Sequence, residues 1–229
     1  MREKQSPTQF TDKVALLFLL LLSDPERKWH VHDFRREGIS MGWASEILSA
    51  LHDSHLVERE YRGKFSYTTL VSPQRLIGTW TERYSFSMNR QYSFRSVQKN
   101  ILSELKTACK KEKKPPYALT LHTGANLLAP YVKSPAVHAY LEAKSFGRTL
   151  AFLKKALDLR QVMDGGTIHF YEPFCKEAVF KNTRILRGFR VVSNLQLYLD
   201  LFHHGLRGYE HSTHLKHTLE ERRISLWSK

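Results

Sequence analysis

The sequence lacks most features of secreted, zinc-ribbon and membrane-spanning chains. Only two of its 229 residues are cysteines, Cys109 and Cys175, and they are too far apart to form a Cys-x-x-Cys pair. This argues against a disulfide scaffold and fits a reducing cytoplasm. The longest apolar run, 14–22 (VALLFLLLL), falls short of the ~20 residues that cross a bilayer. Because no small-x-small cleavage site follows it, we interpret it as a buried helix of a soluble protein rather than a signal peptide.

Signatures of catalysis are also scarce. There is no Gly-x-Ser-x-Gly motif, and Gly205-Leu-Arg-Gly208 has the wrong glycine spacing for a phosphate loop. Glu142-Ala-Lys144 matches a fragment of metal-dependent nuclease sites. That chemistry needs a second carboxylate to hold Mg²⁺, and no aspartate lies between Asp53 and Asp158. We therefore expect no catalytic residue and no cofactor, with a nuclease kept as the less favoured alternative.

Histidines cluster late in the chain, which raises the alternative of a zinc site. The cluster consists of His203, His204, His211, His214 and His217. Positions 211 and 217 diverge by roughly 120° on a helix of 3.6 residues per turn. No cysteine or carboxylate is interleaved in a ligand pattern, so a solvated or interfacial histidine face is favoured over a metal site.

Positive charge is abundant and unevenly distributed. The net charge is +14, yet residues 1–72 carry ten Lys/Arg against ten Asp/Glu. Residues 73–229 carry 26 Lys/Arg against 12 Asp/Glu, so the whole excess of positive charge lies in this part of the chain. A basic surface attracts polyanions such as nucleic acid or an anionic membrane, and it dominates non-specific binding to DNA.

The first 72 residues have the pattern of a winged helix-turn-helix. Thr11 predicts the start of a helix over about 11–23, which Asp24-Pro25 ends. A shorter helix is expected at about 31–37, and Gly38 makes the turn into a helix capped by Ser40. Two alternating runs, 57–61 and 65–70, surround an Arg-Gly-Lys tip and predict a β-hairpin.

The second helix of such a motif enters the major groove by its N-terminal end. The residues expected to face DNA there are Ser40, Met41, Trp43, Ser45, Glu46 and Ser49. The cations expected to bind phosphates are Arg35 and Arg36 before that helix, and Arg59, Arg62 and Lys64 on the wing. The proposed recognition helix itself contains no lysine or arginine, which makes base readout by this helix an open question.

Residues 73–229 predict a basic α/β domain with a central sheet. Ser72-Pro73 starts a helix, and 83–95 interleaves aromatics with arginines, which favours a strand over a surface that stacks unpaired bases. The expected strands are 117–121, 137–141, 167–171 and 187–192, and the expected helices are 97–108, 124–131, 149–159, 194–202 and 209–222. A basic patch is expected at Lys106, Lys110, Lys111, Lys113 and Lys114.

A family resemblance rests on three parts of the chain: the segment Val191–Leu201 (VVSNLQLYLDL) with Gly205-Leu-Arg-Gly208, the stretch Tyr117–Gly124, and the winged helix. Together they resemble the AbiEi-like antitoxins of type IV toxin–antitoxin systems. The resemblance implies a transcriptional regulator that binds inverted repeats in double-stranded DNA and represses its own operon. It also implies an abortive-infection antitoxin that counters a nucleotidyltransferase-like toxin without necessarily touching it. The residues that carry over as family markers are Gln196, Tyr198, Asp200, Arg207 and Gly208. An RNA-binding or non-specific nucleic-acid-binding protein is the alternative.

Overall fold

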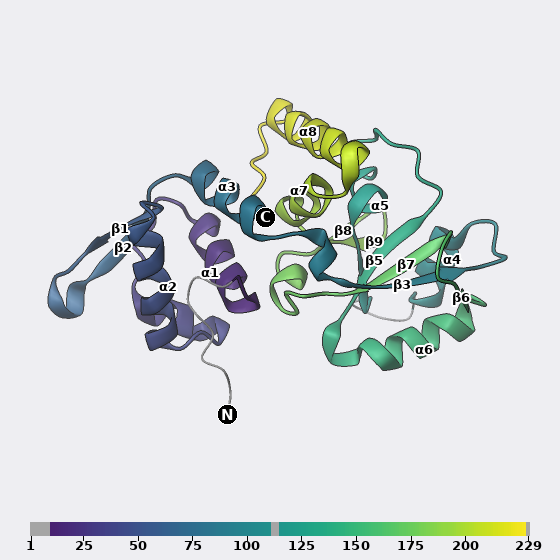
Figure 1. The fold of residues 1–229 in the computed structure, drawn as a ribbon, viewed down its shortest axis with the longest axis horizontal. Coiled ribbons are helices and arrows are strands. Elements are labelled where there is room, and N and C mark those ends of the chain that lie inside the picture. The colour runs from purple at the N-terminus through teal and green to yellow at the C-terminus, as the bar shows by residue number, and fades with distance from the viewer. Residues whose placement is uncertain (1–9, 111–114, 228–229) are drawn as a thin grey trace. The chain divides into compact units, whose positions relative to one another are not determined.

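The structure, a computed structural model, describes residues 10–110 and 115–227 (Figure 1). The chain divides into two compact units, Met1–Tyr84 and Ser85–Lys229. The sequence analysis placed the domain boundary after residue 72, whereas the helix that follows Ser72 packs within the first unit. No helix in the described ranges is both long and apolar enough to cross a membrane.

Three helical segments open the first unit in the expected order. Helix α1 (Asp12–Ser23) begins where the Thr11 hydroxyl accepts a hydrogen bond from the Val14 amide. The second segment, η1 (Val31–Glu37), is a 3₁₀ helix that ends at Gly38, whose φ of +69° suits glycine. Helix α2 (Met41–Asp53) is capped by the Ser40 hydroxyl, which accepts from the Trp43 amide at 3.2 Å.

A hairpin completes the motif and gains a third partner that the sequence did not predict. Strands β1 (Val57–Glu60) and β2 (Tyr67–Leu70) pair antiparallel around the 3₁₀ turn η2 (Gly63–Phe65). Trp29 forms an isolated bridge with Thr68, with mutual backbone hydrogen bonds of 2.8 Å. A single bridging residue carries no strand periodicity, so this contact cannot be predicted from the sequence pattern.

The apolar run of α1 forms the core of the first unit. Leu17, Phe18 and Leu21 are fully buried. Trp80 of helix α3 (Pro73–Arg83) packs edge-on against Phe18, with ring centroids 5.5 Å apart. The apolar run is therefore the packed helix that the sequence analysis favoured.

The second unit is built on a seven-stranded mixed sheet in the order β6-β3-β7-β5-β4-β9-β8. Its central pairs β5–β7 and β4–β9 are parallel, and the remaining pairs are antiparallel. The strands are β3 (Arg90–Arg95), β4 (Tyr117–Leu119), β5 (Val137–Leu141), β6 (Arg160–Gln161), β7 (Ile168–Glu172), β8 (Arg184–Leu186) and β9 (Phe189–Val191). The mixed α and β character expected from the sequence is confirmed.

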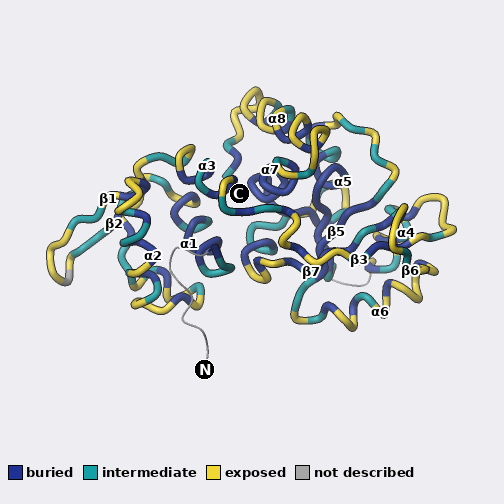
Figure 2. Tube along the Cα trace, in the orientation of Figure 1, coloured by how far each residue is buried: buried dark blue, intermediate teal, exposed yellow. Residues whose placement is uncertain are grey.

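Helices cover both faces of this sheet (Figure 1). One group packs as α5 (Leu121–Ala125), α7 (Asn194–Phe202) and α8 (Gly205–Glu221), and the other as α4 (Ile101–Ala108) and α6 (Phe146–Ala156). Three short 3₁₀ turns complete the unit: η3 (Phe86–Met88), η4 (Ala143–Ser145) and η5 (Ala178–Phe180). Figure 2 shows that α7 is buried almost throughout, which places it at the centre of the unit.

Some expected boundaries were wrong, and each has a local cause. Helix α4 begins at Ile101 rather than 97, because the Asn100 side chain caps it, and Val97 is left 78% exposed. Gly205 begins α8 with a φ of +67° instead of ending α7, so α8 starts before Tyr209. Segment 83–95 contains strand β3, as favoured, and Met88 in the 3₁₀ turn before that strand is 42% exposed.

Candidate nucleic-acid interface

Helix α2 has one buried and one accessible side. Ala44, Ile47, Leu48 and Leu51 form the expected buried stripe. The residues predicted to face DNA lie outside that stripe: Ser40, Met41 and Glu46 are exposed, and Trp43, Ser45 and Ser49 are half-buried. The accessible side of α2 therefore presents small hydroxyls, the carboxylates of Glu46 and Asp53, and the apolar side chains of Met41 and Trp43.

Arg59 from β1 reaches across to that accessible side. Its Nη1 donates to the Ser49 hydroxyl at 2.6 Å and its Nη2 to the Ser45 hydroxyl at 3.4 Å. The guanidinium also lies 5.0 Å from the centre of the Tyr61 ring. A strand thus supplies to α2 the positive charge that the sequence of the helix lacks. Sequence reasoning placed Arg59 on the wing but could not place it against Ser45 and Ser49.

The hairpin tip is less positive than the sequence suggested. Arg62 forms an ion pair with Glu60, whose carboxylate also accepts a hydrogen bond from the Tyr67 hydroxyl. The Tyr67 hydrogen bond and the nearby Arg62 charge lower the pKa of Glu60, outweighing an opposing effect of burial. Lys64 lies in η2, and its side chain is outside the described part of the structure.

Arg35 and Arg36 occupy the last turn of η1 and are both exposed. Cations at the C-terminal end of a helix interact favourably with its dipole, so this position has a structural explanation as well as a functional one.

The basic patch expected in the second unit is only partly described. Lys106 donates to the Arg187 carbonyl at 3.0 Å and lies 5.0 Å from the centre of the Phe189 ring. Lys110 is exposed just after α4. Lys111, Lys113 and Lys114 lie outside the described residues. The Lys106 ammonium is therefore engaged with the β8–β9 turn.

Two of the family-marker residues form a buried polar centre of the second unit. The Asp200 carboxylate is fully buried and accepts hydrogen bonds from Thr120, from the Tyr140 hydroxyl at 3.1 Å and from the Gln196 amide at 2.7 Å. The Ser193 hydroxyl caps α7 as expected, whereas the Gln196 amide turns to Asp200. These bonds tie α7 to β5 and to the residue that follows β4.

The other markers have different surroundings. A Cβ on Gly208 would lie 2.6 Å from the Leu201 carbonyl oxygen, so only glycine allows α8 to approach α7 this closely. Tyr198 is half-buried beside Phe202, and burial raises the pKa of its hydroxyl. Arg207 is exposed on the first turn of α8.

A histidine cluster packs between the sheet and α7–α8, and most of it was missed by sequence reasoning. Stacked ring pairs place His138 and His169 5.0 Å apart and His122 and His211 5.2 Å apart. His204 lies between the pairs, 5.9 Å from His138 and 5.7 Å from His122. His122, His138 and His169 are distant in sequence, and only the pairing of β5 with β7 and the packing of α5 bring them together.

Burial is the main cause of a lowered pKa at all five rings, with His122 shifted to about 4 and His138 well below its ordinary value. His211 Nε2 lies 2.9 Å from the Ala129 carbonyl, so this nitrogen carries the hydrogen. His211 Nδ1 then accepts from His122 Nδ1 across 2.9 Å. Within the described ranges, no group of three or more His, Cys, Asp or Glu side chains could hold a metal ion.

The carboxylate of the nuclease-like tripeptide has a structural partner. Glu142 accepts a hydrogen bond of 2.6 Å from Arg190, which is almost fully buried. Arg190 also donates to the Pro115 carbonyl at 2.7 Å and to the Thr183 hydroxyl at 3.1 Å. Glu142 thus neutralises a buried guanidinium, which gives it a role that needs no metal.

The first unit thus consists of helices followed by a hairpin, and the second is an α/β unit whose buried polar groups bond to one another. A family model described as the transcriptional regulator, AbiEi antitoxin, of type IV toxin–antitoxin systems matches residues 69–219. The chain belongs to this family, which confirms the resemblance stated from the sequence. The match covers β2's last residues, α3 and most of the second unit. No curated protein and no solved structure matches the chain.

Proposed function

We propose that the chain is a DNA-binding transcriptional regulator that represses its own operon. In this proposal the first unit is a winged helix-turn-helix, α2 enters the major groove, and the β1–β2 hairpin is the wing. The order of α1, η1, α2 and the hairpin supports it, as does the family's description as a transcriptional regulator.

The observation that carries the proposal is the position of Arg59. Duplex DNA is bound largely through its phosphates, and a helix with no lysine or arginine is a weak candidate for that role. Because Arg59 bonds to Ser45 and Ser49, its guanidinium lies on the accessible side of α2. The α2 surface thereby gains a cation held in place by two hydroxyls.

The same proposal includes an antitoxin role. The chain would counter a nucleotidyltransferase-like toxin encoded beside it, without direct contact between the two proteins, and the second unit would carry this activity. Membership of the AbiEi antitoxin family is its support.

The test is binding of labelled duplex DNA from upstream of the chain's own gene, compared with scrambled duplex. We expect the wild-type protein to prefer the upstream duplex, and Arg59→Met, which removes one phosphate contact, to weaken that binding about tenfold, equivalent to ~1.4 kcal/mol. Loss of one phosphate contact should also reduce the slope of log K against log salt by about 0.9. Arg75→Met, which removes an exposed arginine from α3, is the matched control and should bind like the wild type.

Equal affinity of Arg59→Met and wild type for the upstream duplex, with both variants folded by circular dichroism, would move the DNA contact away from α2. Equal affinity for upstream duplex, scrambled duplex and single-stranded RNA would favour the alternative of a non-specific nucleic-acid binder.

A further inference from the structure

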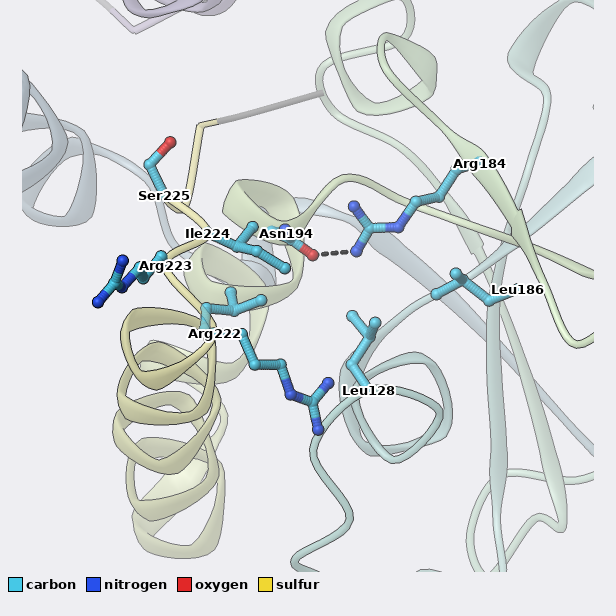
Figure 3. A pocket seen from close by; sticks show the side chains of 9 residues that line it. Leu128, Arg184, Leu186, Asn194, Arg222, Arg223, Ile224 and Ser225 are labelled. Atoms are coloured by element: carbon cyan, nitrogen blue, oxygen red, sulfur yellow. Dashed lines mark hydrogen bonds between the residues drawn. The ribbon is translucent and has the colours of Figure 1, made fainter.

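A cavity of about 500 Å³ opens in the second unit beside the C-terminal end of α8 (Figure 3). Its apolar wall consists of Leu128, Leu186, Leu219 and Ile224, which come from the segment after α5, from β8 and from the end of α8. Small-molecule sites in proteins are commonly ~300–1,000 Å³ and mostly apolar, with a few polar groups that fix orientation. This cavity has the size and the wall of such a site.

Its polar lining is cationic. Arg184, Arg222 and Arg223 all line the cavity, and no carboxylate does. In the close view, the Arg184 guanidinium points towards Asn194, and the Arg222 guanidinium extends beside Leu128 (Figure 3). No ion pair within the described ranges involves any of the three arginines. Among the described residues, the cavity lining therefore carries positive charge with no carboxylate beside it.

Arg184 is the unusual member of this set. It donates to the Asn194 side chain, and its buried Nε has no hydrogen-bond partner among the residues that the structure describes. Burial lowers the pKa of its guanidinium. Partial burial of a guanidinium that has no ionic partner in the described ranges is costly, so an anion beside the guanidinium would stabilise its charge.

The dipole of α8 accounts for only part of the positive charge that lines the cavity. Cations at the end of α8 interact favourably with its dipole, which accounts for Arg222 and Arg223. The acids of the same turn, Glu220 and Glu221, form i,i+4 pairs with Lys216 and His217 and are not directed at the cavity. Arg184 lies on β8 and gains nothing from that dipole. Asn194 opens α7, whose N-terminal end adds a further partial positive charge to the same wall.

We propose that this cavity binds a small organic anion in which a phosphate or carboxylate group is joined to an apolar body. The charged group binds between Arg184 and Arg222, and the apolar part packs on the leucine wall. A planar guanidinium suits either headgroup because it can donate two parallel hydrogen bonds to phosphate or carboxylate.

The test is isothermal titration calorimetry of the full chain at 150 mM NaCl with hexyl phosphate and hexanoate. Hexanol, which has the apolar body without the anionic group, and inorganic phosphate, which has the anionic group without the apolar body, serve as control probes. We expect saturable 1:1 binding of at least one of the two amphiphilic anions, and at least tenfold weaker binding of hexanol and inorganic phosphate. Arg184→Met and Arg222→Met should each weaken binding about tenfold. Arg148→Met, which removes an exposed arginine from α6, should leave it unchanged.

Three results would overturn the proposal: no saturable heat from either anion up to 10 mM, inorganic phosphate bound as tightly as hexyl phosphate, or equal losses in Arg148→Met and Arg222→Met. The last pattern would mean that the net charge of +14, rather than the cavity, attracts the anion. Arg222 is exposed, so its variant remains informative if Arg184→Met fails to fold.

Discussion

Asp200 shows how a single side chain organises the interior of the second unit. Its three named partners, Thr120, Tyr140 and Gln196, all donate hydrogen bonds to the carboxylate. Tyr140 in turn accepts from the Asn89 amide at 3.1 Å. Because the carboxylate acts as an acceptor in every one of these bonds, an amide at this position would lose the negative charge, and its NH2 group would require the Thr120 hydroxyl to turn from donor to acceptor.

Asp200→Asn is therefore expected to lower the free energy of unfolding by about 2–3 kcal/mol, the range for losing hydrogen bonds to a charged group. Urea unfolding followed by circular dichroism measures this change. Asp164→Asn, at an exposed position in the loop before β7, is the control and should stay within about 0.5 kcal/mol of the wild type. A similarly small change in Asp200→Asn would mean that the buried network contributes little to stability.

At the scale of elements, the packing of α7 against α8 depends on Gly208. A methyl group there would lie 2.6 Å from the Leu201 carbonyl and 2.8 Å from the His204 Cβ. Backbone cannot move aside as a flexible side chain can, so the two helices would have to separate. The same requirement applies to Gly124, where a Cβ would lie 2.8 Å from Leu197 and 3.0 Å from the Leu119 carbonyl.

Gly208→Ala is expected to destabilise the protein by about 1–3 kcal/mol, the range for overpacking a well-packed interior. Gly147→Ala in α6 is the matched control, since nothing lies within 4 Å of the Cβ it would add. Alanine is the better helix former by ~0.5–1 kcal/mol, so the control should be neutral or stabilised. Thermal unfolding of both variants compares them directly, and equal melting temperatures would show that the α7–α8 contact can relax at no cost.

At the scale of the whole molecule, five histidines, of which His122, His138 and His211 are buried and His169 and His204 half-buried, make folding sensitive to pH. Their folded-state pKa values lie below the ordinary value of 6.5, with His122 at about 4. Between pH 6.5 and 4 the unfolded chain binds more protons than the folded one. Stability is therefore fully present above pH 6.5 and is lost as the pH falls through this range.

We expect the free energy of unfolding to be lower at pH 5.5 than at pH 7.5, with a contribution from His122 on the order of 1 kcal/mol. Urea unfolding at the two pH values measures it. His122→Gln should reduce this pH dependence, whereas His217→Gln, at an exposed site on α8, should preserve it. Identical pH dependence in wild type and His122→Gln would rule out a contribution from His122.

The sequence by itself determined the local structure: Thr11, Ser40, Ser72 and Ser193 each cap a helix where the pattern predicted one, and 57–70 forms a hairpin. Caps, turns and apolar periodicity act over a few residues, so they can be read directly from the chain. The predicted DNA contacts of the first unit remain a proposal.

Only the tertiary structure decided which distant side chains meet. Arg59 lies against Ser45 and Ser49, and His122 against His211, because strand pairing and helix packing bring together residues that no short-range pattern relates. The Arg184 cavity belongs to the same category, since its walls come from β8, α7 and α8. Local propensities fix elements, whereas contacts between elements depend on long-range burial that a single sequence does not display.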